Sequence, residues 1–152
     1  LIADEPTTAL DVTIQAQILD LMIQLKEKRT EAAVLLITHD LAVIAETCER
    51  VIVMYGGKIQ EIAQVGELFS NPLHPYTKGL MTSIPHPDKT EKKERLNAIN
   101  GMVPPIMDMP VGCKFCTRCN EAMGHCATDE PELIQVSPRH FVRCHLYESE
   151  NE

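Results

Sequence analysis

Two adjacent carboxylates, Asp4 and Glu5, follow a short apolar run at the start of the sequence. Such a run indicates a buried strand, and open α/β sheets bind their ligands at the carboxyl ends of strands. Because successive side chains of a strand point to opposite faces, the two acids can do separate jobs. One can bind Mg²⁺, which prefers one or two carboxylates together with substrate phosphates. The other can orient and deprotonate an attacking water.

His39 stands in the equivalent place after a second apolar run, residues 33–38. We expect that run to be a buried parallel strand, so that the imidazole lies at the same edge as the two acids. A histidine there can contact a γ-phosphate, and phosphoryl transfer depends on positioning and charge stabilisation more than on covalent chemistry. Taken alone, the acid pair also fits a helix cap or a solvated strand end.

The elements that would position these residues alternate between strand and helix. Apolar residues after Asp11 recur at helical spacing, which predicts an amphipathic helix with Asp11 as its N-cap. Asp40 is placed to cap a second helix, and residues 50–55 and 58–63 flank a Gly-Gly turn as a hairpin. This order predicts an α/β fold in which a parallel sheet closes with an antiparallel edge hairpin.

The character of the sequence changes after residue 70, where prolines become frequent and a charged stretch occupies residues 88–95. We therefore expect a boundary near Ser70, with residues 1–70 forming the α/β part and residues 71–152 a small extension around a cysteine cluster. The chain also begins inside the expected core strand without a Met, so we expect it to be the C-terminal half of a larger protein.

Five of the six cysteines lie between residues 113 and 144. Without a secretory context, such crowding indicates metal or redox chemistry. The first three form a C-x₂-C-x₂-C run, but a bacterial ferredoxin would place its next cysteine after three residues, and here six intervene before Cys126. A zinc ribbon would need two separate CxxC pairs, and only one overlapping set exists. Spacing alone leaves an iron–sulfur cluster, zinc and reduced structural thiols open.

Composition excludes some partners. The formal net charge of −8 argues against nucleic acid, since nucleic-acid footprints are basic. The low aromatic content of 4%, with no Trp, also argues against base-stacking platforms. No apolar run is long enough to cross a bilayer.

Other residues have simpler interpretations. His74 lies between two prolines in the segment HPYT, and the restricted conformation before a proline indicates a turn and packing role. Cys48 stands apart in a helical stretch and is interpreted as a core thiol. His125, His140 and His145 flank the cysteines, and any of them is an alternative ligand of a zinc site.

Several segments together resemble one family. LIADEPTTALD, residues 1–11, resembles the Walker B segment and D-loop of ABC-type transport ATPases, and LLITHD, residues 35–40, resembles their switch-histidine segment. The segments DVTIQAQILDLM and NPLHPYTKGLMTSIP, with the cysteine-rich end, are similar to the ATP-binding subunits of oligopeptide/dipeptide import systems. The resemblance covers nearly the whole chain.

The resemblance implies a role for each residue of the acidic site. Asp4 would contact the Mg²⁺ of Mg-ATP, and Glu5 would be the general base that polarises the attacking water. His39 would sense the γ-phosphate, and Asp11 would lie at the dimer interface and couple two ATP sites. The glycine loop with its lysine (Walker A), the glutamine loop and the signature motif would all lie upstream of Leu1, and no G-x-x-x-x-G-K-[ST] occurs here. We therefore expect the fragment alone to be inactive.

The family also commonly carries a C-x₅-C-x₆-C pattern with a distant fourth cysteine, and some members bind a 4Fe–4S cluster there. Carried over, this pattern implies Cys113, Cys119, Cys126 and Cys144 as cluster ligands, with Zn²⁺ as the alternative metal. Cys116 departs from the pattern, because relatives often have His at its place. Its role stays open, as a spare thiol, an alternative ligand or a neighbour that tunes the centre.

The implied function is an ATPase subunit that energises uptake of oligopeptides or dipeptides, working at the cytoplasmic face of the membrane as a peripheral subunit. The implied partners are a second ATPase subunit, identical or homologous, transmembrane permease subunits and, indirectly, a peptide-binding protein. A second reading treats the chain as a non-catalytic metal-binding interaction module, in which Asp4, Glu5 and His39 are expendable. The sequence leaves the transported substrate open.

Overall fold

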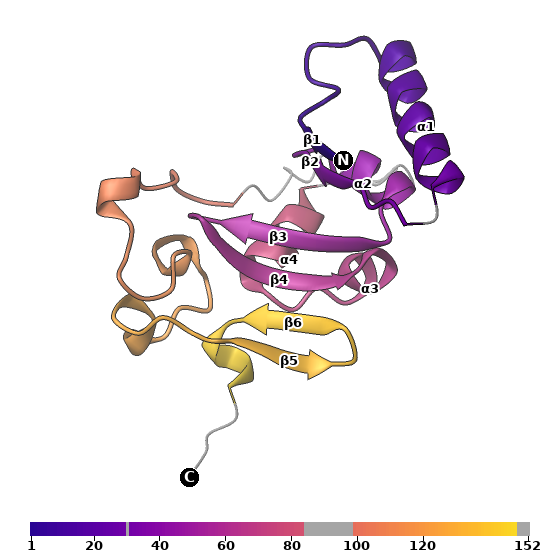
Figure 1. Ribbon diagram of the computed structural model, residues 1–152. Helices are drawn as coiled ribbons and strands as arrows, with labels where there is room; N and C mark the ends of the chain where they lie inside the picture. The colour runs from indigo at the N-terminus through magenta and orange to yellow at the C-terminus, as the bar shows by residue number, and fades with distance from the viewer. Residues whose placement is uncertain (30, 84–98, 149–152) are drawn as a thin grey trace, which may run out of the picture. The chain divides into compact units, whose positions relative to one another are not determined.

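The structure is a computed structural model that describes residues 1–29, 31–83 and 99–148. It divides the chain into two units, Leu1–Cys48 and Glu49–Glu152, which are described separately (Figure 1). The charged stretch at residues 88–95 lies outside the described residues. The mixed α/β character expected from the sequence is confirmed.

The first unit contains a two-stranded parallel sheet and two helices. Strand β1 (Ile2–Asp4) pairs with β2 (Leu35–Ile37), so that Ile2 lies opposite Leu35 and Asp4 opposite Ile37. Because the two strands run in the same direction and in register, the residues that follow them leave the sheet at one edge.

Both helices of this unit begin at the aspartates predicted to cap them. Asp11 accepts hydrogen bonds from the backbone N–H groups of Thr13 and Ile14 and starts α1 (Val12–Lys28). Asp40 caps α2 (Leu41–Thr47) in the same manner. Each cap satisfies backbone donors that a helix N-terminus leaves unpaired.

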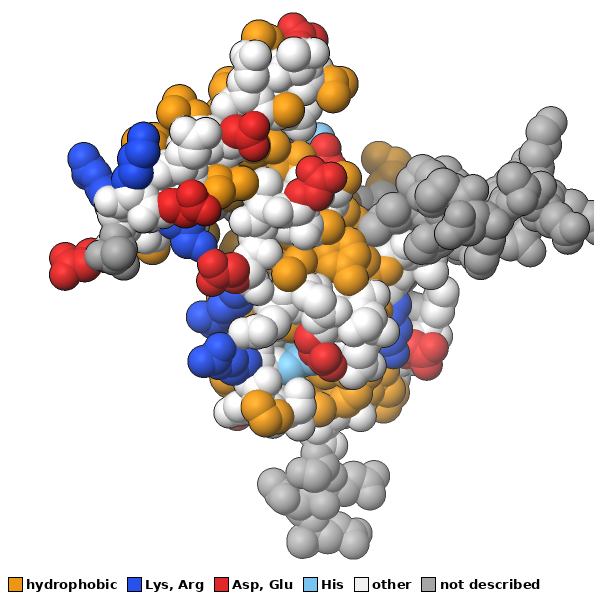
Figure 2. Space-filling view, turned by 90° about the vertical axis from the view of Figure 1, so that its right-hand side faces the viewer, with side chains coloured by type: hydrophobic (Ala, Val, Ile, Leu, Met, Phe, Trp, Pro, Cys, Tyr) orange, Lys and Arg blue, Asp and Glu red, His pale blue; other side chains and the backbone are white. Residues whose placement is uncertain are grey.

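Much of the apolar surface of the first unit is exposed. Leu19 is the buried residue of α1, whereas Ile14, Leu21 and Leu25 of the predicted apolar pattern are exposed. Figure 2 shows hydrophobic side chains reaching the molecular surface beside acidic ones. Among the described residues, no helix is long and apolar enough to span a bilayer.

The second unit contains a four-stranded antiparallel sheet in the order β3-β4-β6-β5. Its strands are β3 (Arg50–Tyr55), β4 (Lys58–Gln64), β5 (Leu133–Ser137) and β6 (His140–Arg143). The predicted β3–β4 hairpin is confirmed, and it turns through Gly56 and Gly57, both at positive φ as a two-residue hairpin requires. The hairpin continues into β6 rather than standing alone, and its predicted place at the edge of a larger parallel sheet stays a prediction.

Two short helices and the cysteine-rich loops pack with this sheet. The helices are α3 (Val65–Ser70) and α4 (Pro75–Thr82), and short 3₁₀ turns begin at Ile106, Cys116, Gly124 and His145. One core cluster joins Tyr55 of β3 to Phe115, and another joins Leu73 to Val142 of β6. Residues on both sides of Ser70 therefore share one core, while the predicted domain boundary at Ser70 stays a prediction for the longer protein.

Candidate functional site

The ends of β1 and β2 bring an acid and a histidine together. Glu5 directly follows β1, and His39 lies two residues after the end of β2. The His39 Nδ1 atom lies 2.9 Å from the Glu5 Oε1 atom. The Glu5 backbone N–H also donates to the Ile37 carbonyl at 2.8 Å, which extends the strand pairing to the acid itself. The structure therefore joins two of the residues expected at this edge.

Thr8, which the sequence analysis did not single out, fixes the other oxygen of this carboxylate. Its hydroxyl donates to Glu5 Oε2 at 2.7 Å across a turn. Glu5 has φ +43°, a left-handed conformation that costs an L-residue about 1–2 kcal/mol. The separation of three residues along the chain is the only feature of the sequence that links the two side chains.

The two hydrogen bonds set the charges of the pair. The Thr8 hydroxyl and then His39 lower the pKa of Glu5, and the hydrogen bond to Glu5 raises the pKa of His39. At a pH between the two shifted pKa values, the contact joins a carboxylate to an imidazolium. Both side chains are exposed, so solvent screens the attraction and leaves the pair free to separate.

Asp4 and Asp11 lie outside the hydrogen-bonded pair of Glu5 and His39. Asp4 ends β1 with an exposed side chain, where its oxygens suit a hard divalent cation such as Mg²⁺. Asp11 uses one carboxylate oxygen as the cap of α1. Their expected roles toward Mg-ATP and a second subunit stay predictions.

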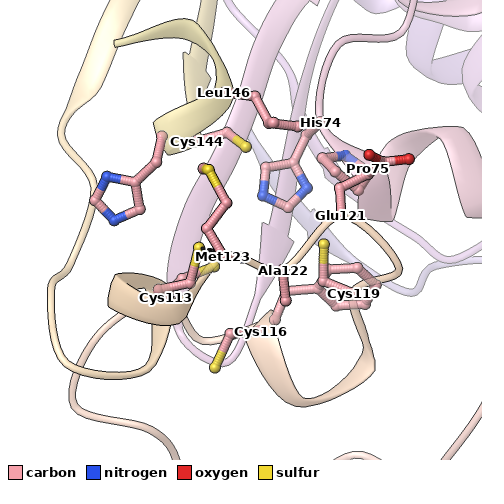
Figure 3. Close-up of a pocket in the computed structure, with 13 residues that line it drawn as sticks. His74, Pro75, Cys113, Cys116, Cys119, Glu121, Ala122, Met123, Cys144 and Leu146 are labelled. Atoms are coloured by element: carbon pink, nitrogen blue, oxygen red, sulfur yellow. Dashed lines mark hydrogen bonds between the residues drawn. The ribbon is translucent and has the colours of Figure 1, made fainter. Parts of the chain in front are cut away.

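The five clustered cysteines line one small pocket in the second unit (Figure 3). Its thiols come from three places: the segment 113–119, the 3₁₀ turn at Gly124–Ala127, and the residue that follows β6. The side chains that line the pocket with them include those of His74, Phe115, Glu121 and Met123. Within the described part of the chain all six cysteines are free thiols.

A close backbone approach holds two of these thiols beside each other. The Cys113 N–H donates to the Cys126 carbonyl at 2.8 Å, and the Gly112 N–H donates to the Ala127 carbonyl at 3.1 Å. A Cβ atom at Gly112 would lie 2.5 Å from the Cys126 carbonyl oxygen, so no side chain fits there. Glycine at this position is therefore a condition for the pocket.

Burial favours the protonated form of four of these thiols when no metal is bound. It raises the pKa of Cys113, Cys116 and Cys119, and it raises that of Cys144 to about 11, with the neighbouring cysteines adding to the shift. Metal binding would have to displace these protons, so affinity would rise with pH. A soft-donor set in a buried pocket fits a thiolate metal centre.

Among the described residues, the group whose ligand atoms already lie close enough for one metal ion shares Cys126 and His145 with this pocket. The ligand atoms of His125, Cys126 and His145 lie within 4.8 Å of one another. His145 already contacts the Asp129 carbonyl through Nε2 at 3.0 Å and Glu148 through Nδ1 at 2.6 Å. Since a carbonyl only accepts, Nε2 carries a proton there and has no lone pair for a metal.

A buried carboxylate, that of Glu61 in β4, holds the backbone of His74, which lines the pocket. Its two oxygens accept the backbone N–H groups of Leu73 at 2.8 Å and His74 at 2.9 Å, and the His140 Nε2 atom lies 2.7 Å away. Glu61 is fully buried and His140 is 1% exposed. This contact, which the sequence analysis did not anticipate, ties β4 to β6 and to the segment that carries His74.

Comparison with known proteins places these features in a family. Residues 60–126 match the family described as the oligopeptide/dipeptide transporter C-terminal region. The oligopeptide transport ATP-binding protein AppD of Bacillus subtilis is 55% identical over 150 residues, which are 99% of this chain and 45% of that protein. The dipeptide transport ATP-binding protein DppD of Haemophilus influenzae is 48% identical over 145 residues, which are 95% of this chain and 43% of that protein.

A probable peptide ABC transporter ATP-binding protein of Sinorhizobium fredii is 54% identical over 144 residues, 95% of this chain and 42% of its own length. The chain thus spans less than half the length of these relatives, and the match to the Bacillus subtilis protein, which covers 99% of the chain, extends over both the acidic edge and the cysteine-rich end. These similarities support the assignment of the chain as a C-terminal part of an ATP-binding subunit of a peptide ABC transporter.

Proposed function

We propose that this chain is the C-terminal part of an ATP-hydrolysing subunit that energises import of oligopeptides or dipeptides. The observation that carries the proposal is the contact between Glu5 and His39 at the ends of two parallel strands. The proposal is also supported by the similarity of the chain to proteins named as ATP-binding proteins of peptide transport. These relatives do not favour a metal-binding module as an alternative to the ATPase.

In this proposal each residue of the acidic edge has one task. Asp4 would hold Mg²⁺ in part, and the ion, when bound, would supply charge neutralisation to the phosphates. Glu5, oriented by Thr8 on one oxygen, takes a proton from the attacking water on the other. His39 leaves Glu5 to contact the γ-phosphate, and Asp11 at the start of α1 faces a second ATPase subunit.

We further propose the organisation expected for the longer protein. Residues 1–70 would belong to the nucleotide-binding domain, with the hairpin at the edge of its parallel sheet, and residues 71–152 to the transporter extension. The subunit would work at the cytoplasmic face of the membrane with transmembrane permease subunits, and a peptide-binding protein would deliver the substrate.

The need for a phosphate-binding glycine loop provides a direct test of the proposed function. The sequence contains no glycine loop with its lysine, so the isolated 152-residue chain is expected to show negligible ATP turnover, whereas the full-length parent hydrolyses Mg-ATP. Phosphate release at saturating Mg-ATP measures both. The chain with Glu5→Gln sets the background, and turnover of the unmodified chain above it would contradict the assignment. A parent without ATPase activity would overturn the proposed function.

We also propose that Cys113, Cys119, Cys126 and Cys144 hold a metal centre, with a 4Fe–4S cluster ahead of zinc. The chain, loaded anaerobically with ferrous iron and sulfide, is expected to gain a visible sulfur-to-iron absorbance that Cys119→Ser abolishes. Cys48→Ser in the other unit is the matched control and should load normally, as should Cys116→Ser. A colourless protein with one zinc would assign zinc instead, and loss of loading in Cys116→Ser would change the ligand set.

A further inference from the structure

The ring of His74 has one nitrogen in use and one without a partner. His74 is the N-cap of α4, and its Nδ1 atom accepts the backbone N–H of Tyr76 at 3.0 Å. A peptide N–H only donates, so Nδ1 is unprotonated and the ring proton resides on Nε2. Within the described residues, Nε2 has no hydrogen-bond partner, although the side chain is only 1% exposed.

The position of this ring is fixed on several sides. The Glu61 carboxylate holds the backbone N–H of His74, and the Tyr76 N–H holds Nδ1. The ring also packs at a tilt against Phe115, with centroids 5.9 Å apart. An unpaired buried N–H costs about 1–3 kcal/mol, so a donor held this firmly requires an acceptor.

The pocket that the ring lines offers mainly sulfur as an acceptor. Figure 3 shows the His74 ring among the side chains of Cys144, Met123 and Cys119. Two oxygen acceptors compete. The Glu121 carboxylate belongs to an exposed residue, and the Arg143 main chain, although it raises the pKa of His74 against the larger effect of burial, makes no hydrogen bond to Nε2. Thiolate sulfur bound to a metal is the acceptor that the buried side of the pocket supplies.

We propose that His74 donates an Nε2–H···S hydrogen bond to the metal–thiolate centre of this pocket and so acts as a positioning residue. The inference rests on the thiol centre of the proposed function. His74 is not a ligand in this arrangement, because coordination through Nε2 would move its proton to Nδ1 and break the contact with Tyr76. Hydrogen bonds to sulfur stabilise the more negative state of such a centre and raise its reduction potential.

Two substitutions test the roles of the two ring nitrogens separately. His74→Asn keeps a short acceptor in the place of Nδ1, and Asn is a favourable N-cap, but its amide does not reach as far as Nε2. His74→Gln reaches that place with an amide N–H but is a poorer cap. The pair therefore distinguishes loss of the donor from loss of the cap.

The test uses the full 152-residue chain loaded with ferrous iron and sulfide. His74→Asn is expected to load to the same iron and sulfide content, with the reduced-to-oxidised ratio at fixed potential lowered about tenfold, or about 59 mV for one electron. His74→Gln should recover at least half of that shift. If only cobalt loads, the thiolate-to-cobalt band should move to longer wavelength in His74→Asn and return in His74→Gln.

Each other outcome overturns the inference in a recognisable way. Identical potentials and bands in wild type and His74→Asn would mean that Nε2–H serves an oxygen acceptor, and equal shifts in both variants would indicate packing alone. Failure of His74→Asn to bind the metal despite a native circular dichroism spectrum would mean that His74 is a ligand of the metal.

If His74→Asn does not fold, the cadmium-loaded wild type provides the test. Scalar coupling between the Nε2 proton and cadmium is expected, and its absence would overturn the proposed hydrogen bond. Wild type that binds neither iron nor cobalt would remove the thiol centre itself, while the ATPase test is unaffected.

Discussion

Glu5→Gln in the full-length parent is expected to lower ATP turnover by about 100-fold or more while ATP still binds. Glutamine has the same shape, so its oxygen can still accept from Thr8 and its amide can still meet His39. It cannot take a proton from water, so it removes the general base without removing the geometry. Turnover and nucleotide affinity measured on the same preparation separate these two effects.

A second readout follows the charge of the pair. The hydrogen bond to Glu5 raises the pKa of His39, so the stability that His39 contributes is present below its ordinary pKa and lost as the pH rises through the raised value. The pKa of Glu5 is lowered, so its contribution is present above its ordinary pKa and lost as the pH falls through the lowered value. In Glu5→Gln the pKa of His39, followed by NMR titration of the chain, should fall toward its ordinary value.

Glu46→Gln, on the exposed face of α2, is the matched control for both measurements. It removes one acidic charge from the same unit and should change neither turnover nor the pKa of His39. Full turnover in Glu5→Gln would remove Glu5 as the base and favour a non-catalytic module.

Glu61→Ala is expected to lower the free energy of unfolding of the second unit by about 3–5 kcal/mol. The change leaves two backbone N–H groups and the His140 ring in the interior without their acceptor. Glu61→Gln should be nearly as damaging, because one amide oxygen cannot replace two carboxylate oxygens that together accept three donors. Urea unfolding of the metal-free chain, followed by far-ultraviolet circular dichroism, gives the change in midpoint.

Glu132→Ala is the control for this substitution, since it removes an exposed glutamate from the same unit. It should change the free energy of unfolding by no more than about 0.5 kcal/mol. A loss below about 1 kcal/mol in Glu61→Ala would mean that the buried contact contributes little, and that apolar packing around β6 holds the sheet.

The features that could be predicted from the sequence are those in which the interacting residues lie within a few positions of each other. Asp11 and Asp40 each precede a helical pattern and cap it through backbone groups two and three residues on. Gly56 and Gly57 together specify a tight hairpin turn. In each case the residue type and its partner lie in one short window, so local chemistry is sufficient.

The features that escaped prediction depend on distant partners. An acid within a strand normally indicates a solvated face, but β4 runs between β3 and β6, and four consecutive residues from Gln60 to Ala63 are buried. His140, the partner of Glu61, lies 79 residues away. Nothing in the spacing of these residues shows that they meet. The turn role inferred for His74 agrees with its place as the cap of α4, while the free Nε2 atom emerges only from the packed pocket.

The strand order has a consequence for synthesis. Strand β6 lies between β4 and β5 in space but is made last of the four. Until β6 leaves the ribosome, the hairpin keeps an unpaired edge with the Glu61 carboxylate uncovered. Pairing must then close across the 79 residues that separate Glu61 from His140. Closure at such long sequence separation is slow, so the nascent chain passes through a period in which this open edge is prone to aggregation.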